Sequence, residues 1–184
     1  MLGSIRCRLI TLMLAALISM VLPDRAPAAD ATAGDPGHDE ENSPINNSGL
    51  PVPRFVSLRS AEVNLRTGPG VRYPVEWVFV RREMPVEITA EFDTWRRIRD
   101  WDGTEGWVHQ SMLSGKRAIV VTAKTRTLRS DAAASAAPVA QVEAGVIGRL
   151  LHCRADWCQV ELAGYRGWLQ RGEFWGVYPT ERID

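Results

Sequence analysis

The chain has 184 residues, of which 45% are hydrophobic and 24% are charged, and its 22 basic and 22 acidic residues cancel. This composition excludes a wholly disordered chain, and the length excludes a large two-domain enzyme. Because there is no surplus of basic residues, we expect no nucleic acid among its partners.

The first segment has the layout of a secretory signal peptide. Two arginines precede an apolar run of 14 residues over 9–22, and a cleavage pattern of small residues follows. A membrane-spanning helix is the rival interpretation, but it needs about 20 apolar residues. We predict a signal peptide over residues 1–28, cut after Ala28 or Ala29. The mature protein is then periplasmic or secreted, without a stable membrane anchor.

The next segment, residues 29–53, differs sharply in composition. It carries five acidic residues and no basic one, is rich in Asp, Gly, Pro and Asn, and shows no apolar periodicity. Such a segment buries too little apolar surface to offset its chain entropy. We therefore predict a disordered acidic linker over residues 29–53.

From residue 54 onward the chain consists of short apolar or alternating runs separated by turn residues, a pattern typical of β-strands. No segment sustains a helical period over three turns. We expect strands over 75–80, 85–90, 95–101 and 105–109, with Asp102-Gly103 as the hairpin turn before the last of these.

The same pattern then occurs a second time, at offsets of 61 to 63 residues. Two copies of about 60 residues, each with four to six short strands, predict two small all-β domains in tandem. We name them repeat 1, residues 54–115, and repeat 2, residues 116–184. The matching elements are Asn64-Leu65-Arg66 with Thr127-Leu128-Arg129, Trp95 with Trp157, and Gly106-Trp107-Val108 with Gly167-Trp168-Leu169.

These motifs carry a resemblance to the bacterial SH3 domain family. In repeat 1 they are Asn64-Leu65-Arg66, Gly68-Pro69-Gly70 with Tyr73-Pro74, Trp95 with Ile98, and Gly106-Trp107-Val108. Repeat 2 departs from the pattern, because its first loop has no Gly-Pro-Gly. The resemblance implies a small SH3-like β-barrel for each repeat. It also implies a non-catalytic targeting module, in many members for the bacterial cell wall and in others for a protein.

Cys153 and Cys158 are the two cysteines left after the predicted cleavage. In an oxidising compartment such a pair is expected to form a disulfide, and strand-like segments flank the four residues between them. A four-residue hairpin loop would place the cysteines opposite each other. A metal site is the alternative, but even with His152 only three ligands gather here, and a structural zinc site needs four. A catalytic cysteine is disfavoured because His152, next in sequence, points to the opposite face of a strand.

The residues with catalytic potential do not form any known catalytic motif. Three histidines are present, and neither a nucleophile elbow, a zinc-protease motif nor a phosphate-binding loop occurs. We expect no enzyme, no cofactor and no metal, and a hydrolase is the least favoured reading.

Two surfaces of repeat 1 are candidate ligand sites. Arg66, Arg72 and Tyr73 lie on the first loop, although Tyr73 can equally serve to pack that loop down. Period-2 alternation places Arg97, Arg99 and Trp101 on one strand face, which suits carboxylates of peptidoglycan or an acidic protein strand. The plainer alternative is a solvated face paired with Glu91, Asp93 or Glu105.

The seven tryptophans divide into two groups. Those of the two Gly-Trp pairs, Trp107 and Trp168, are expected to fill the small cores. Trp77, Trp101 and Trp175 lack clean counterparts in the other repeat and are candidates for a surface platform. We therefore expect a non-enzymatic exported envelope protein that binds peptidoglycan or cell-wall peptide, with a periplasmic protein–protein adaptor as the alternative.

Overall fold

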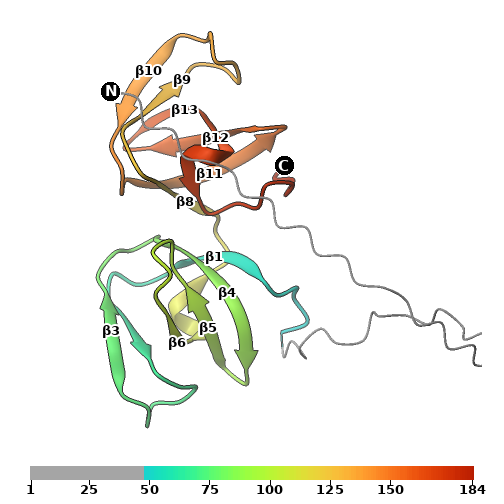
Figure 1. Ribbon diagram of the computed structural model, residues 1–184. Coiled ribbons are helices and arrows are strands. Elements are labelled where there is room, and N and C mark those ends of the chain that lie inside the picture. The colour runs from blue at the N-terminus through green and yellow to red at the C-terminus, as the bar shows by residue number, and fades with distance from the viewer. Residues whose placement is uncertain (1–47) are drawn as a thin grey trace, which may run out of the picture. The chain divides into compact units, whose positions relative to one another are not determined.

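The structure is a computed structural model that describes residues 48–184. The predicted signal peptide, residues 1–28, and all but the last six residues of the predicted linker, 29–53, lie outside the described residues. Regular structure in the described part is β-strand and two short 3-10 helices (Figure 1). No helix within residues 48–184 has the length and apolar character needed to cross a membrane.

Repeat 1 folds as one seven-stranded sheet in the order β3-β2-β6-β5-β4-β1-β7. Its neighbouring strands are antiparallel throughout, so hairpins join β4 to β5 and β5 to β6. The elements are β1 (Arg54–Leu58), β2 (Val63–Arg66), β3 (Val75–Phe79), β4 (Pro85–Phe92), β5 (Trp95–Arg99), β6 (Glu105–His109), η1 (Gln110–Met112) and β7 (Leu113–Ser114).

Repeat 2 folds as a second seven-stranded sheet, in the order β10-β9-β13-β12-β11-β8-β14. This is the order of repeat 1 with every strand advanced by seven, so the prediction of two all-β repeats in tandem is confirmed. The elements are β8 (Ala118–Val121), β9 (Arg126–Arg129), β10 (Pro138–Val142), β11 (Ile147–Arg154), β12 (Trp157–Leu162), β13 (Tyr165–Gln170), η2 (Arg171–Glu173) and β14 (Phe174–Trp175).

Each repeat has its own hydrophobic core, and the third residue of each Gly-Trp motif enters it. Val108 and Leu169 are fully buried in the two core clusters. Trp107 lies on the opposite face and is only half-buried, because neighbouring residues of a strand alternate between faces. The prediction that Trp107 fills the core is therefore wrong.

Trp168 is buried, as predicted, but outside the main cluster of repeat 2. The ring of His152 meets it edge-on at 4.9 Å between centroids, and the Arg154 guanidinium lies 5.1 Å from its centre. His152 thus serves to cover Trp168.

The glycine of each Gly-Trp pair permits close packing of two strands. A Cβ on Gly106 would lie 2.6 Å from the Leu65 side chain and 2.9 Å from the Arg66 carbonyl oxygen. A Cβ on Gly167 would lie 2.6 Å from the Arg129 carbonyl oxygen. No larger residue fits at either position without moving backbone.

The disulfide between Cys153 and Cys158 is confirmed. The two residues face each other across the β11–β12 ladder, with 4.1 Å between their Cα atoms. The hairpin loop is shorter than predicted, because Arg154 and Trp157 also pair and leave only Ala155 and Asp156 in the turn. Ala155 takes a left-handed φ of 49° to make that tight turn possible.

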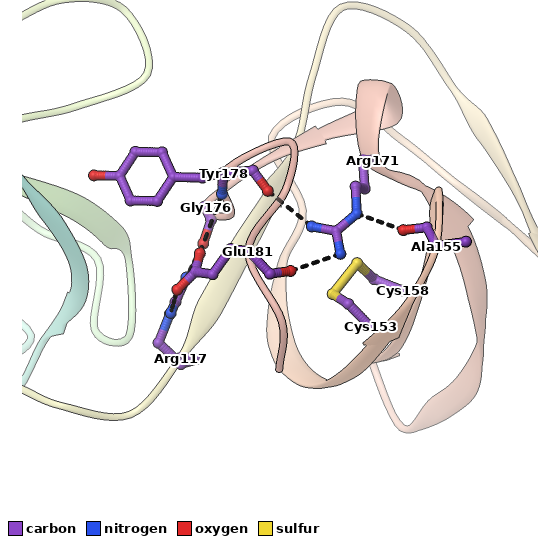
Figure 2. Close-up of a disulfide and its surroundings, with 8 residues drawn as sticks. All are labelled: Arg117, Cys153, Ala155, Cys158, Arg171, Gly176, Tyr178 and Glu181. Carbon is purple, nitrogen blue, oxygen red and sulfur yellow. Dashed lines mark hydrogen bonds and ion pairs between the residues drawn. A yellow bond between two sulfur atoms is a disulfide. The ribbon is translucent and has the colours of Figure 1, made fainter. Parts of the chain in front are cut away.

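Arg171 fastens the last residues of the chain to this hairpin, as Figure 2 shows. Its guanidinium donates hydrogen bonds to the carbonyl oxygens of Ala155 (2.7 Å), Tyr178 (2.8 Å) and Glu181 (2.7 Å). Glu181 also forms an ion pair with Arg117. Burial raises the pKa of Glu181, but the hydrogen bonds from Arg117 and the Tyr178 backbone outweigh it, so the net pKa lies below the ordinary value.

Candidate functional site

The first-loop residues predicted as ligand contacts hold the loop in place. The Arg66 guanidinium donates to the carbonyl oxygens of Val71 (3.1 Å) and Tyr73 (2.7 Å). The Tyr73 ring packs beneath Gly68, where an added Cβ would lie 2.5 Å from the ring. The packing role that the sequence left open for Tyr73 is therefore the one observed. Arg72 stacks on the same ring, 5.3 Å from its centre.

Arg97 and Arg99 lie exposed on one face of β5, as the alternation predicted. Arg97 forms an ion pair with Glu105 at 2.6 Å, a partner that the sequence named. Arg99 instead pairs with Glu87, whose other oxygen accepts a 2.7 Å hydrogen bond from the Tyr178 hydroxyl. The hydrogen bond to Glu87 and the charge of Glu87 raise the pKa of Arg99. The pKa of Tyr178 is also raised, mainly by burial and in addition by its hydrogen bond to Glu87. Both arginines are thus paired with carboxylates of the same molecule.

Trp101 leaves this arginine face and packs against the core of repeat 1. There it lines a cavity of about 450 Å³ together with Trp77, which is 56% exposed on β3. The structure therefore brings together two of the three tryptophans proposed as a platform. We call this cavity the tryptophan groove. Its other lining residues include Val78, Val80, Arg81 and Asp102 of repeat 1 and Gly145 of repeat 2, whose carbonyl oxygen accepts a 3.0 Å hydrogen bond from Arg81.

A tight turn fixes the position of Trp101. The buried Asp100 carboxylate accepts hydrogen bonds from the backbone N–H groups of Asp102 (3.0 Å) and Thr104 (2.8 Å). Gly103 completes the turn with a φ of 88°, a left-handed value that favours glycine. The predicted Asp102-Gly103 turn is thus present, and Asp100, which the sequence analysis passed over, organises it.

The other wall of the groove is an edge strand. β3 pairs with β2 alone, and it exposes Val75 (42%) and Val78 (40%) besides Trp77. Edge strands of stable monomers usually carry charges or proline that block further pairing, and β3 carries one charged residue, Glu76. The groove therefore joins an apolar surface to an open strand edge.

Trp175, the third proposed platform residue, serves a different purpose. Its ring meets Phe55 edge-on at 4.7 Å between centroids, and Phe55 also contacts Tyr178 at 4.7 Å. The prediction that Trp175 forms a surface platform is not supported by its position.

Within residues 48–184, no three or more His, Cys, Asp or Glu side chains are grouped so as to hold a metal ion. The arrangement around the groove is instead one of aromatic rings, aliphatic side chains and a few polar groups. Such a surface suits a ligand that stacks on aromatic rings and forms hydrogen bonds.

The model of the bacterial SH3 domain matches residues 59–115 and again residues 123–176, together more than half of the chain. The chain belongs to the bacterial SH3 domain family. The resemblance inferred from the motifs is confirmed, and the two matched segments cover the two sheets apart from their first strands, β1 and β8.

Solved structures similar to part of this bacterial SH3 protein match it at low identity and with TM-scores below 0.5. They include NlpC2 and NlpC1 from Trichomonas vaginalis, at 12% and 14% identity with TM-scores of 0.33 and 0.32. An NlpC/P60 family protein from Bacillus cereus matches at 13% identity and a TM-score of 0.30. The alignments cover 72%, 74% and 71% of this chain but only 50%, 50% and 58% of those proteins. A search of curated proteins gave no match.

Proposed function

We propose that this protein is a non-enzymatic module of the bacterial cell envelope that binds peptidoglycan through the tryptophan groove of repeat 1. One observation carries the proposal: Trp77, exposed on an edge strand, and Trp101, held by the Asp100 turn, line one cavity of about 450 Å³. That volume lies within the range of known small-ligand sites.

The groove offers the contacts that a cell-wall peptide requires. Indole rings stack on apolar and carbonyl-bearing faces, and Asp102 and Arg81 supply one charge of each sign at the rim. The outer edge of β3 offers backbone hydrogen-bonding groups to an extended peptide. Membership of a family that commonly serves as targeting modules supports an envelope location and a binding role without catalysis.

The experiment is co-sedimentation of the purified protein with peptidoglycan sacculi. We expect the wild-type protein to pellet with sacculi and Trp77→Ala to remain largely in the supernatant, because truncating a central aromatic contact costs about 1–3 kcal/mol. A wild-type protein that stays in the supernatant at every sacculus concentration overturns the proposal.

The exposed β3 edge also favours a second candidate, a periplasmic protein–protein adaptor. A partner strand could add to β3 and cover Val75 and Val78. This alternative predicts no sedimentation with sacculi. It predicts instead that a single protein co-purifies with the wild type and is lost with Trp77→Ala.

A further inference from the structure

A second cavity is lined by residues of repeat 1 and by Lys116, the first residue of repeat 2, and it shares no lining residue with the tryptophan groove. It measures about 280 Å³ and is lined by the end of β1, by the turn between β3 and β4, and by the segment after β7. Three of its lining side chains are cationic and all three are exposed: Arg59, Arg82 and Lys116. We call it the basic pocket; its other lining residues are Ser57, Leu58, Glu83 and Ser114.

The positive charge of the basic pocket is not balanced within the molecule. Across the described residues, eight ion pairs occur, and none includes Arg59, Arg82 or Lys116. The Arg59 side chain donates from Nε to the Leu113 carbonyl oxygen at 3.1 Å, which fixes its direction and leaves its charge uncompensated. Glu83 is the single acidic residue in the lining.

Repeat 2 contains the same turn and allows a direct comparison. In repeat 1, Leu58 N–H donates to the Met84 carbonyl and Glu83 N–H donates to the Leu58 carbonyl, both at 2.9 Å. In repeat 2, Val121 and Gly145 make the corresponding bonds, at 3.0 and 2.8 Å. These bonds show which residues are equivalent in the two turns.

By that equivalence the two arginines are specific to repeat 1. Arg59 corresponds to Thr122, and Arg82 corresponds to Ala144, so repeat 2 has neither charge. Glu83, with a φ of 62°, takes the place of Gly145, whose φ is 83°. A glutamate in a left-handed conformation is less favourable than a glycine, and such departures gather at functional positions.

We propose that the basic pocket is a binding site for a phosphate group, carried by a polymer or small molecule of the envelope. Arginine guanidinium groups bind phosphate oxygens through paired hydrogen bonds, and a lysine adds a point charge. Three cations against one carboxylate suit the double charge of a phosphate better than the single charge of a carboxylate. The adjacent residues Arg81 and Arg82 divide between the tryptophan groove and the basic pocket, so the two sites are neighbours with separate chemistry.

The test is a titration of the isotope-labelled protein with inorganic phosphate at constant ionic strength, followed by NMR. We expect saturable shifts of the backbone amides of Arg59, Arg82 and Lys116. The double variant Arg82→Gln/Lys116→Gln should weaken phosphate binding about tenfold or more, since hydrogen bonds to charged groups carry more energy than neutral ones.

The matched control is Lys124→Gln/Arg149→Gln, which removes the same charge from exposed positions of repeat 2. It should bind phosphate like the wild type. An equal loss of phosphate affinity in both double variants overturns the proposal, because attraction would then follow net charge alone. The absence of saturable shifts in the wild type also overturns it, because no specific binding would then occur. All four positions are exposed, so we expect both variants to fold.

Two further arms identify the ligand and separate this proposal from the proposed function. Acetate should bind clearly more weakly than phosphate at equal ionic strength; equal affinity would overturn the assignment to phosphate and indicate a carboxylate site. Trp77→Ala should lose sacculus binding and keep phosphate binding. If Trp77→Ala loses phosphate binding as well, the basic pocket is not a separate site.

Discussion

The β4–β5 hairpin of repeat 1 and the β11–β12 hairpin of repeat 2 carry different cross-strand links at equivalent positions. In repeat 2, Cys153 faces Cys158 across the β11–β12 ladder and forms the disulfide. In repeat 1, the corresponding cross-strand pair is Glu91 and the buried Arg96, which form an ion pair at 3.3 Å. The hairpin is thus stabilised by a covalent bond in repeat 2 and by an ion pair in repeat 1.

The two hairpins share their remaining features. Asp93 and Ala155 take left-handed φ values of 48° and 49° at the same turn position. An arginine donates to the carbonyl oxygen of each, Arg96 at 2.8 Å and Arg171 at 2.7 Å. Both copies thus keep the turn and an arginine donor to it, although Arg96 lies on β5 and Arg171 in η2, whereas the link across the strands differs.

The surfaces of the repeats differ more than their scaffolds. Trp77 lies opposite Leu65 on β2, and the residue opposite the equivalent Leu128 is Ala140. The loop between β5 and β6 that carries Trp101 has five residues, 100–104, whereas its counterpart between β12 and β13 consists of Ala163 and Gly164 alone. Repeat 2 therefore has no equivalent of the tryptophan groove.

The shared scaffold is tested by a matched pair of core substitutions. Leu65→Ala and Leu128→Ala remove fully buried leucines at equivalent positions, and each should lower the unfolding free energy by about 3 kcal/mol. Trp107→Ala should cost less, about 1–2 kcal/mol, because Trp107 lies half-buried outside the core. Chemical denaturation measures all three. A Trp107→Ala effect larger than that of Leu65→Ala would contradict the observed placement.

The covalent link of repeat 2 is tested by removing it. Cys153→Ala/Cys158→Ala should destabilise repeat 2 by about 2 kcal/mol, because the bond closes a short loop in the unfolded chain. Repeat 1 should keep its stability, which hydrogen exchange resolved by residue can measure separately. An equal loss of protection in both repeats would show that the disulfide is not a local device of repeat 2.

The Glu91 carboxylate, which is paired with Arg54 and Arg96, should make repeat 1 sensitive to acid. Burial raises the pKa of Glu91, but hydrogen bonds from Ser48 and Arg54 and the charge of Arg54 outweigh it, so the net pKa lies below the ordinary 4.5. A group with a lowered folded-state pKa stabilises the fold above its unfolded pKa, and that stability is lost as the pH falls through the folded pKa.

Unfolding of repeat 1 should therefore become easier below about pH 4.5, and Glu91→Gln should reduce this dependence. Thermal denaturation between pH 3 and 7 measures it. A Glu91→Gln variant with the same pH profile as the wild type would exclude Glu91 as the source.

A smaller effect is expected at Arg97, one of the residues predicted as a ligand contact. Because Arg97 is exposed and paired with Glu105, Arg97→Ala should change affinity for peptidoglycan by less than about 0.5 kcal/mol. Trp101→Ala should weaken binding by about 1–3 kcal/mol. Fluorescence titration with soluble peptidoglycan fragments measures both. If Arg97→Ala is the more damaging change, the arginine face of β5 is the site.

Much of the fold follows from residue patterns within the sequence. The repeated Leu-Arg and Gly-Trp motifs predicted two copies of one all-β fold, because their spacing fixes the same strands twice. The pairing of Cys153 with Cys158 was also predictable, since few residues separate the two. These are local features that need no knowledge of distant contacts.

The site was less predictable because its two walls are distant in sequence. Trp77 and Trp101 were each proposed as surface residues, but their common cavity depends on where β3 lies in the sheet. Strand alternation extended the face of Arg97 and Arg99 to Trp101, yet β5 ends at Arg99 and the Asp100 turn redirects the chain. Arg99 pairs with Glu87 on the neighbouring strand, a partner that sequence distance conceals.

We propose that ligand affinity resides in the tryptophan groove of repeat 1. Trp77 and Tyr165 are both 56% exposed, one on each repeat, and therefore form a matched pair. The decisive measurement is the dissociation constant of soluble peptidoglycan fragments for the wild type, Trp77→Ala and Tyr165→Ala. We predict a loss of about tenfold or more for Trp77→Ala and no change for Tyr165→Ala. Wild-type binding by Trp77→Ala together with a loss in Tyr165→Ala would contradict the account.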